Sequence, residues 1–282
     1  MMRNAILFSS HLLDDVVLAR LNKLRSEVPA GFEVYFFFDE AKLRKKDVLR
    51  HARAPALEHG NDSWMKYKKA NRYFTTKIPG NEDGMLLGAF HRMPRHDYYW
   101  YLEYDVVYSG NWKDFFAEFD ENSTDMLSTN ISRHDEIPDW PLWKSVEMPD
   151  GMDLPKNLWL RSFNPILRLS HRAMEVLTEE CRKGSAGHSE AVMPTMLMHR
   201  GLSIEDFGGN SEFTPAEREH RHYRSNRLDN SLAPGTFVFR PAMNAPGVEP
   251  RKLWHPVKDT THKTWDKPAS FWGMLRRKIM TK

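Results

Sequence analysis

The chain has 282 residues, a net charge of +3 and one cysteine. Its apolar content of 40% and charged content of 28% are those of an ordinary globular protein, which excludes a disordered chain. The positive charge is small and scattered, so we expect no nucleic-acid partner. Because Cys181 stands alone, an internal disulfide and a cysteine-based zinc site are also excluded.

Neither end of the chain predicts a membrane span. The apolar run 5–8 is too short for the core of a signal peptide, and no stretch approaches the roughly 20 apolar residues that a span needs. We therefore expect a cytoplasmic protein. The tail 266–282 mixes apolar residues with three adjacent cations, which suits a basic amphipathic helix at the inner face of an anionic membrane. A terminal helix docked on the domain fits the same composition.

The chain opens with a strand–helix–strand pattern. Residues 4–9 form an apolar run typical of a buried strand, and 12–28 carry apolar residues at helical spacing. Ser10 is placed to cap this helix. A second apolar strand, 33–38, ends at Asp39. This βαβ unit implies a right-handed crossover and a parallel sheet.

The alternation continues along the chain. The pattern predicts helices over 41–54, 82–91, 112–119, 171–182 and 189–200, and strands over 98–108, 125–129, 164–169, 202–207 and 236–240. Residues 135–157, rich in Pro, Trp, Met and Asp, indicate a long irregular loop, which in a compact domain is usually functional or mobile. We expect a single α/β, Rossmann-like domain over 1–265, with a mostly parallel sheet flanked by helices.

The most informative motif is Glu103-Tyr104-Asp105, at the end of the densest apolar run. Alternation along a strand puts Glu103 and Asp105 on one side, and ligands of open α/β sheets bind outside the carboxyl ends of strands. Two such carboxylates repel each other unless a cation lies between them, and oxygen ligands suit Mg²⁺ or Mn²⁺. The alternative is a turn whose two acids are solvated or paired with arginine.

An apolar strand that ends in acid-x-acid, about a hundred residues after a βαβ opening, resembles the metal-binding region of GT-A glycosyltransferases. The sequence Tyr-Leu-Glu-Tyr-Asp-Val at 101–106, followed by Gly-Asn-Trp at 110–112, resembles one group of GT-A-like proteins in particular. Glu103 departs from the family's usual Asp. The resemblance implies that Asp105 is the main metal ligand, and that Glu103 supports it by reaching the donor ribose or the metal through water.

A later segment, Leu-Trp-His-Pro-Val-Lys at 253–258, fits the same resemblance. GT-A enzymes commonly return a C-terminal histidine to the metal and pyrophosphate, which implies His255 as a further metal ligand. Lys258 would then neutralise the departing diphosphate. From the residues alone, His255 fits equally well as a partly buried histidine at the end of a strand.

A third candidate is Glu190. Pro194 limits how far upstream the helix over 189–200 can start, so Glu190 lies at or near its N-terminus. The resemblance implies that Glu190 is the catalytic base that deprotonates the acceptor, with His188 as the second choice. The alternative is a glutamate that only favours the helix dipole.

The nucleotide of the donor is expected at the ends of the first two strands. Ser9, Ser10 and His11 follow the first strand, and an acid at the position of Asp39 holds the uracil or ribose in the family. Asp39 suits a helix cap equally well. Trp140, Trp143 and Trp159 flank the long loop, where they fit either sugar stacking or a core.

The resemblance implies a cytoplasmic glycosyltransferase of polysaccharide biosynthesis. It would move a sugar from a nucleoside-diphosphate sugar to a saccharide or glycolipid acceptor, with Mn²⁺ or Mg²⁺ as cofactor. Residues 1–110 would then bind the nucleotide and 111–265 the acceptor. Two alternatives stay open: a metal-dependent nucleotidyltransferase or phosphohydrolase, and a catalytically inactive GT-A-like binding protein.

Overall fold

The computed structural model describes residues 2–60, 64–69, 71, 73, 80–149 and 151–258. The basic tail expected over 266–282 lies outside these residues. Among the helices of the described part, none has the length and apolar content to cross a membrane.

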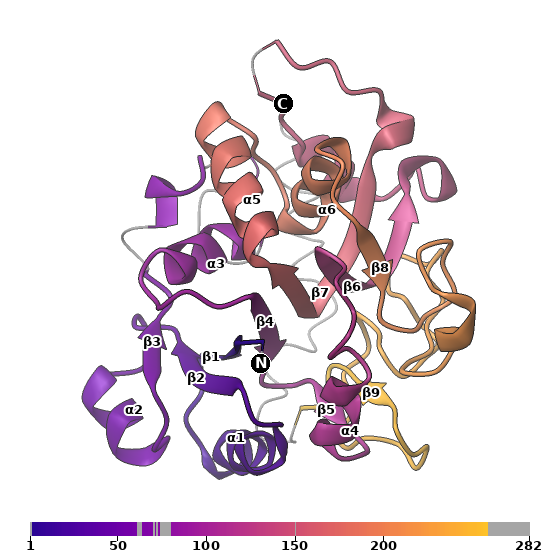
Figure 1. Ribbon diagram of the computed structural model, residues 1–282. Helices are drawn as coiled ribbons and strands as arrows, with labels where there is room; N and C mark the ends of the chain where they lie inside the picture. The colour runs from indigo at the N-terminus through magenta and orange to yellow at the C-terminus, as the bar shows by residue number, and fades with distance from the viewer. Residues whose placement is uncertain are drawn as a thin grey trace.

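A seven-stranded sheet forms the centre of the molecule (Figure 1). Its order is β3 (Ala56–Glu58), β2 (Phe32–Phe38), β1 (Asn4–Ser10), β4 (Tyr98–Glu103), β7 (Leu160–Ser170), β6 (Met126–Arg133) and β8 (Ile204–Asp206). Only β7 runs antiparallel to its neighbours β4 and β6. The other four pairings are parallel, so the predicted mostly parallel α/β fold is confirmed.

Helices cover both faces of this sheet, as the sequence pattern predicts. One face carries α1 (Asp15–Glu27), α2 (Lys45–His51) and α4 (Trp112–Ala117), and the other carries α3 (Glu82–Phe90), α5 (His171–Lys183) and α6 (Ser189–His199). A second sheet pairs β5 (Val107–Tyr108) with β9 (Leu253–Trp254). Five short 3₁₀ helices complete the described elements: η1 (Trp64–Lys66), η2 (His134–Glu136), η3 (Pro141–Ser145), η4 (Lys156–Leu158) and η5 (Ala216–Arg218).

The first helix begins later than expected, and Ser10 is not its cap. The side chain of Asp14 accepts the backbone N–H of Val17 at 2.9 Å and so caps α1. Ser10 Oγ instead bonds to the backbone oxygen and nitrogen of Leu12, at 2.8 and 3.0 Å. A serine hydroxyl can form hydrogen bonds either to a helix N-terminus or to the backbone of the turn in which it lies. Ser10 forms the second kind.

Three further predictions were wrong. The single strand expected over 98–108 is divided into β4, which ends at Glu103, and β5, which belongs to the second sheet. The basic stretch expected as a helix over 41–54 is helical only over Lys45–His51. The last strand expected over 236–240 does not form, because Phe237 makes only an isolated bridge with His255.

The expected loop 135–157 is irregular but tightly packed. It contains η2, η3 and the start of η4, and its side chains form a cluster with α6. Trp140, Trp143 and Trp159 are all buried in that cluster. The Trp143 indole donates to Ile137 O at 2.9 Å, so its polar edge is satisfied inside the protein. The three tryptophans therefore belong to a core and do not form a sugar-stacking surface.

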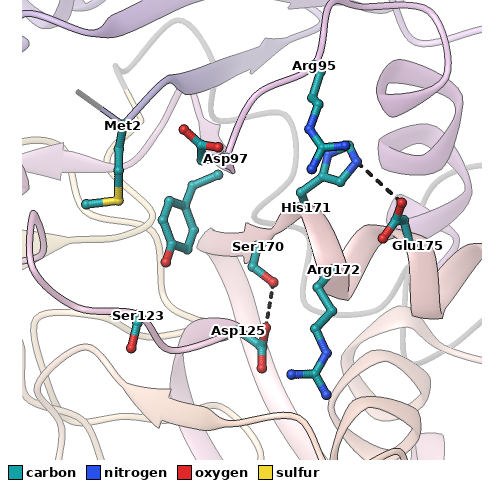
Figure 2. Close-up of a pocket in the computed structure, with 10 residues that line it drawn as sticks. Met2, Arg95, Asp97, Ser123, Asp125, Ser170, His171, Arg172 and Glu175 are labelled. Atoms are coloured by element: carbon teal, nitrogen blue, oxygen red, sulfur yellow. Dashed lines mark hydrogen bonds and ion pairs between the residues drawn. The ribbon is translucent and has the colours of Figure 1, made fainter.

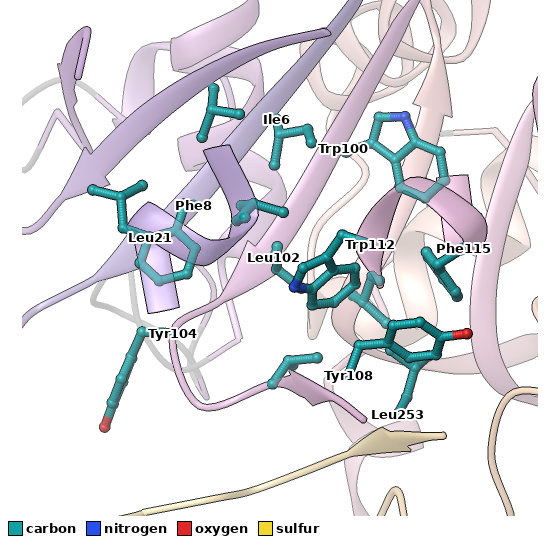
Figure 3. Packing of buried hydrophobic residues seen from close by; sticks show 14 of the residues in the cluster. Ile6, Phe8, Leu21, Trp100, Leu102, Tyr104, Tyr108, Trp112, Phe115 and Leu253 are labelled. Carbon is teal, nitrogen blue, oxygen red and sulfur yellow. The ribbon is translucent and has the colours of Figure 1, made fainter. Parts of the chain in front are cut away.

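Trp100, in the middle of β4, is the largest fully buried side chain of the core (Figure 3). Its indole N–H donates to Asn4 Oδ1 at 3.1 Å, which ties β4 to β1. The ring packs against the aromatic residues Phe32, Phe115, Phe116, Phe119 and Phe207. The strand that ends in Glu103 is thus held on this face by close aromatic packing.

We expect Trp100→Ala to lower the free energy of unfolding by about 3–5 kcal/mol, because it leaves a large cavity and an unpaired Asn4 amide oxygen. Urea titration followed by circular dichroism measures this. Leu49→Ala is the control, since Leu49 is 53% exposed and should change stability by less than about 0.5 kcal/mol. Similar losses for both variants would contradict this description of the core.

Candidate active site

The chain turns sharply after β4, and this turn presents two carboxylates. Tyr104 N–H donates to Ser9 O at 2.9 Å and Val106 N–H to Glu103 O at 3.1 Å. The Tyr104 ring is buried in the core cluster, while the carboxylates of Glu103 and Asp105 lie close to each other. Because Ser9 and Glu103 are register partners, the turn lies at the carboxyl ends of β1 and β4.

The C-terminal segment returns to this turn. β9 pairs antiparallel with β5, and Val257 N–H donates to Asp105 O at 2.9 Å. His255 Nε2 lies 3.6 Å from Asp105 Oδ1 and 3.7 Å from Glu103 Oε2. One ligand atom from each of these three residues lies within 4.8 Å of the others. The structure therefore brings together the three residues that the sequence suggested for a metal.

The His255 ring is fixed with its second nitrogen available. His255 Nδ1 lies 2.8 Å from Val238 O and donates to it, while Nε2 faces the two carboxylates. Phe163 and Phe237 pack against the ring at 5.3 and 5.2 Å between centroids. A histidine that donates one N–H to a carbonyl while its other nitrogen faces outward is typical of a metal ligand.

Asp105 and Glu103 have the environment of cation ligands. Asp105 is buried, and its Oδ1 accepts no hydrogen bond from the residues that the structure describes. Its other oxygen lies 3.3 Å from the ammonium of Lys258. Burial raises the pKa of Glu103, His255 opposes this shift, and Asp105 adds to it. Two oxygen ligands and one imidazole fit Mn²⁺ or Mg²⁺ by chemistry and by arrangement.

Glu190 lies in the first turn of α6, as expected. Its Oε1 lies 3.4 Å from the backbone nitrogen of Asn164 on β7. Burial raises the pKa of Glu190 to about 8, and the negative charges of Glu82 and Glu103 add to the shift, while Arg161 opposes it. Glu190 therefore holds a proton at neutral pH in the ligand-free protein.

His188 is the N-cap of α6, because its Nδ1 accepts the backbone N–H of Glu190 at 3.3 Å. Burial, with the nearby charge of Lys68, lowers the pKa of His188 to about 3. The imidazole is thus neutral and already uses its acceptor nitrogen. This arrangement favours Glu190 over His188 as a proton acceptor.

The three residues expected to bind the nucleotide lie at the ends of β1 and β2. Ser9 is buried, lies 3.2 Å from His59 Nε2 and accepts the Tyr101 hydroxyl at 3.3 Å. Ser10 serves its own turn, as described above. Asp39 accepts the N–H of Ala41 at 3.0 Å, so it caps the turn after β2. All three lie on the correct edge of the sheet, but each side chain already has a partner within the protein.

His11, directly after Ser10, lies at the same edge of the sheet. Its ring meets Tyr104 edge-on, with 5.3 Å between centroids. Burial lowers the pKa of His11, Lys258 lowers it further, and Asp105 and Asp39 oppose the shift. His11 thus lies between the expected nucleotide end and the metal group. Its place directly after β1 was the only sequence signal.

No sequence pattern pointed to Lys68 and Asp83. Their side chains form a fully buried ion pair at 2.8 Å. Lys68 Nζ also donates to Gly187 O at 2.6 Å, immediately before His188. Residues 55–81 show no periodicity, and a single lysine in such a stretch is normally exposed. This buried cation holds the segment that leads into α6.

A polar hollow lies at the opposite edge of the sheet (Figure 2). It is lined near the start of β4 by Asp97 and Tyr98 and near the start of α5 by Ser170 and His171. Ser170 Oγ donates to Asp125 Oδ1 at 2.7 Å, and His171 lies 3.5 Å from Glu175. None of the candidate site residues lines this hollow.

Comparison with known proteins shows only remote likenesses. No family model matches the sequence, and no curated protein matches it. Similar solved structures include both nucleotidyltransferases and glycosyltransferases.

Three of these solved structures show the degree of similarity. CMP:2-keto-3-deoxy-manno-octonic acid synthetase complexed with CTP is 14% identical over 76% of this chain and 94% of its own, with a TM-score of 0.41. Mouse xyloside xylosyltransferase 1 is 14% identical over 73% and 85%, also at 0.41. The galactosyltransferase LgtC, in complex with donor and acceptor sugar analogs, is 12% identical over 71% and 73%, at 0.36.

We expect Asp105→Asn and His255→Ala each to weaken the binding of Mn²⁺ at least tenfold, because each removes one of three ligand atoms. Isothermal titration with Mn²⁺ alone measures this. His199→Ala is the control, since His199 is exposed at the end of α6. If wild type and all variants bind Mn²⁺ alike, or none binds it, the three residues are not a metal site.

Proposed function

We propose that the chain is a divalent-metal-dependent glycosyltransferase. It would move a sugar from a nucleoside-diphosphate sugar to a saccharide or glycolipid acceptor. The observation that carries this proposal is the meeting of Glu103, Asp105 and His255 at the carboxyl ends of parallel strands, with Glu190 held nearby. Ligands of open α/β sheets bind at that edge.

The donor end of the site would bind the diphosphate. Glu103, Asp105 and His255 would hold Mn²⁺ or Mg²⁺, whose charge stabilises a departing diphosphate when the ion is bound. Lys258, 3.3 Å from Asp105, adds a positive side chain to the same place. The nucleoside would extend over the ends of β1 and β2, toward Ser9, Ser10 and Asp39. Since all three side chains already have partners within the protein, backbone groups at these strand ends would make most of those contacts.

The acceptor end of the site would use Glu190. Once deprotonated, its carboxylate takes the proton of an acceptor hydroxyl while that oxygen bonds to the anomeric carbon and the diphosphate departs. The hydrogen bond from Asn164 N–H and the nearby Arg161 stabilise the charged carboxylate. This reaction inverts the configuration at the anomeric carbon. A retaining reaction is the alternative if Glu190 is not the base.

A nucleotidyltransferase is the second candidate, because the same metal ligands would bind a nucleoside triphosphate equally well. Glu190 distinguishes the two, since a second buried carboxyl with a raised pKa suits a base acting on a hydroxyl. Thermal shift with nucleotide sugars and nucleoside triphosphates, each with and without Mn²⁺, separates the candidates. Stabilisation by triphosphates and by no nucleotide sugar would reject glycosyl transfer. Binding of a nucleotide sugar without turnover would identify an inactive binding protein.

We also propose that the protein acts in the cytoplasm, and that the tail 266–282 brings it to an anionic membrane surface. The tail's apolar and cationic composition supports this part of the proposal.

We expect Glu190→Gln to lower the transfer rate about 10²–10⁴-fold while donor affinity stays near that of wild type, because only the proton acceptor is lost. Release of nucleoside diphosphate in the presence of an acceptor measures the rate, and calorimetry measures donor affinity. Glu175→Gln, on an exposed residue of α5, is the control. Transfer at the wild-type rate by Glu190→Gln would remove this residue from the mechanism and favour a retaining reaction.

The raised pKa of Glu190 also predicts a pH dependence. Since only the deprotonated carboxylate is a base, turnover should rise with pH and level off above about 8. Stability should change in the opposite sense: the contribution of protonated Glu190 is complete below the ordinary glutamate pKa and is lost as pH rises through about 8. Unfolding and rate profiles from pH 5 to 9 test both trends. In Glu190→Gln this stability trend should flatten; an unchanged slope would contradict the assignment.

A further inference from the structure

The pairing of β6 with β7 is irregular next to Glu190. The register of the two strands shifts between Leu127 and Thr129, and again between Thr129 and Ser132. Asn130 has a φ of 52°, in the left-handed region that non-glycine residues rarely adopt. Irregularities of this kind re-aim side chains and are frequent next to active sites.

Two asparagine amides at this irregularity are held in the same way. The Ser225 hydroxyl donates to Asn130 Oδ1, and the Ser128 hydroxyl donates to Asn164 Oδ1 at 2.6 Å. Each amide oxygen is thereby fixed, and each NH₂ group points away from its serine. Asn130 is 2% exposed and Asn164 6%, yet neither Nδ2 has an acceptor within the described part of the chain. A buried donor of this kind is costly unless something accepts from it.

Asn164 lies between the proposed base and the metal group. Its backbone nitrogen lies 3.4 Å from Glu190 Oε1, and the Ser162 hydroxyl donates to the backbone oxygen of Glu190 at 3.4 Å. Phe163, which lies between Ser162 and Asn164 in the chain, packs on the ring of His255. The reacting sugar must occupy this interval if Glu190 and the metal group act on the same bond.

Asn130 is held just as firmly on the neighbouring strand. Its backbone N–H donates to the Tyr223 hydroxyl at 2.6 Å, and that hydroxyl donates to the buried carboxylate of Asp206 at 2.8 Å. Thr129 and Phe163 are register partners, so Asn130 and Asn164 flank one cross-strand pair. Both amides are therefore fixed in place before any ligand binds.

We propose that the side-chain amides of Asn164, which lies beside Glu190, and of Asn130, on the neighbouring strand, form a saccharide subsite and donate hydrogen bonds to sugar hydroxyl oxygens. This inference rests on the proposed function and deepens it. Neutral N–H donors at fixed positions suit neutral hydroxyl oxygens, which a sugar presents on adjacent carbons. The subsite takes either the transferred sugar of the donor or the acceptor saccharide, and the same chemistry serves both.

The test follows the side-chain NH₂ resonances of Asn130 and Asn164 in the ¹⁵N-labelled full chain with Mg²⁺, assigned with Asn130→Ala and Asn164→Ala. The titrants are the nucleotide sugar that binds in the thermal-shift panel, its nucleoside diphosphate, and the free disaccharides lactose and maltose. Shifts with the nucleotide sugar but not with the nucleoside diphosphate assign the donor sugar. Shifts with a disaccharide assign the acceptor.

Affinity provides the second measurement. Asn164→Ala should weaken binding of the sugar-bearing ligand by roughly 2- to 15-fold and leave that of the nucleoside diphosphate unchanged, since one uncharged hydrogen bond is lost. Asn157→Ala, at an exposed position, is the control. Unmoved resonances with every titrant, together with unchanged affinity, would mean that the amides bind only buried water and would overturn the subsite. If no nucleotide sugar binds the wild type, the proposed function fails first and the subsite with it.

Discussion

Two carboxylates presented by one short turn repel each other, and Glu103 and Asp105 can stay together only if positive charge or a cation faces them. A segment from later in the chain supplies the Lys258 ammonium as positive charge and the His255 imidazole as a nitrogen that can bind a cation. His255 and Lys258 come back to the turn, and the Val257–Asp105 hydrogen bond fixes their position. The return of the segment after β8 to the end of β4 thus places a positive charge and an imidazole where they relieve this repulsion.

The environment of Glu190 depends on the same balance. Glu82 and Glu103 disfavour its charge and Arg161 favours it, so a bound cation at Glu103 would ease deprotonation of Glu190. Metal binding and the basicity of Glu190 are then physically coupled. A base that becomes effective only when the donor and its ion are in place would limit loss of the donor to water.

The start of α6 is positioned mainly by loop and 3₁₀-helix residues, and less by the strands of the sheet. Gly187 has a φ of 127°, and a Cβ there would lie 2.5 Å from Ser145 O, so the two backbones touch. His188 N–H donates to Ser145 Oγ at 2.9 Å, and Lys68 holds Gly187 from the other side. The tryptophan cluster of the 135–157 segment packs against α6 and makes this contact rigid.

The sequence by itself determined the alternation of strands and helices, the parallel start and the carboxylate pair at the end of β4, whereas the return of His255 to that pair was implied only by the family resemblance. Apolar periodicity and a carboxylate pair at the end of a strand are local properties, so they can be recognised in the sequence without knowledge of the fold. The prediction that Ser10 caps α1 was wrong. Ser10 and Asp14 are both residue types that cap helices, and which of them does so depends on the geometry of the turn before α1. The roles of Lys68 and Asn164 could not be predicted for a different reason. Lys68 is buried against Asp83, and the Ser128 hydroxyl holds the Asn164 amide. Burial and hydrogen-bond partners are set by residues far away in the chain, and those neighbours exist only in the tertiary structure.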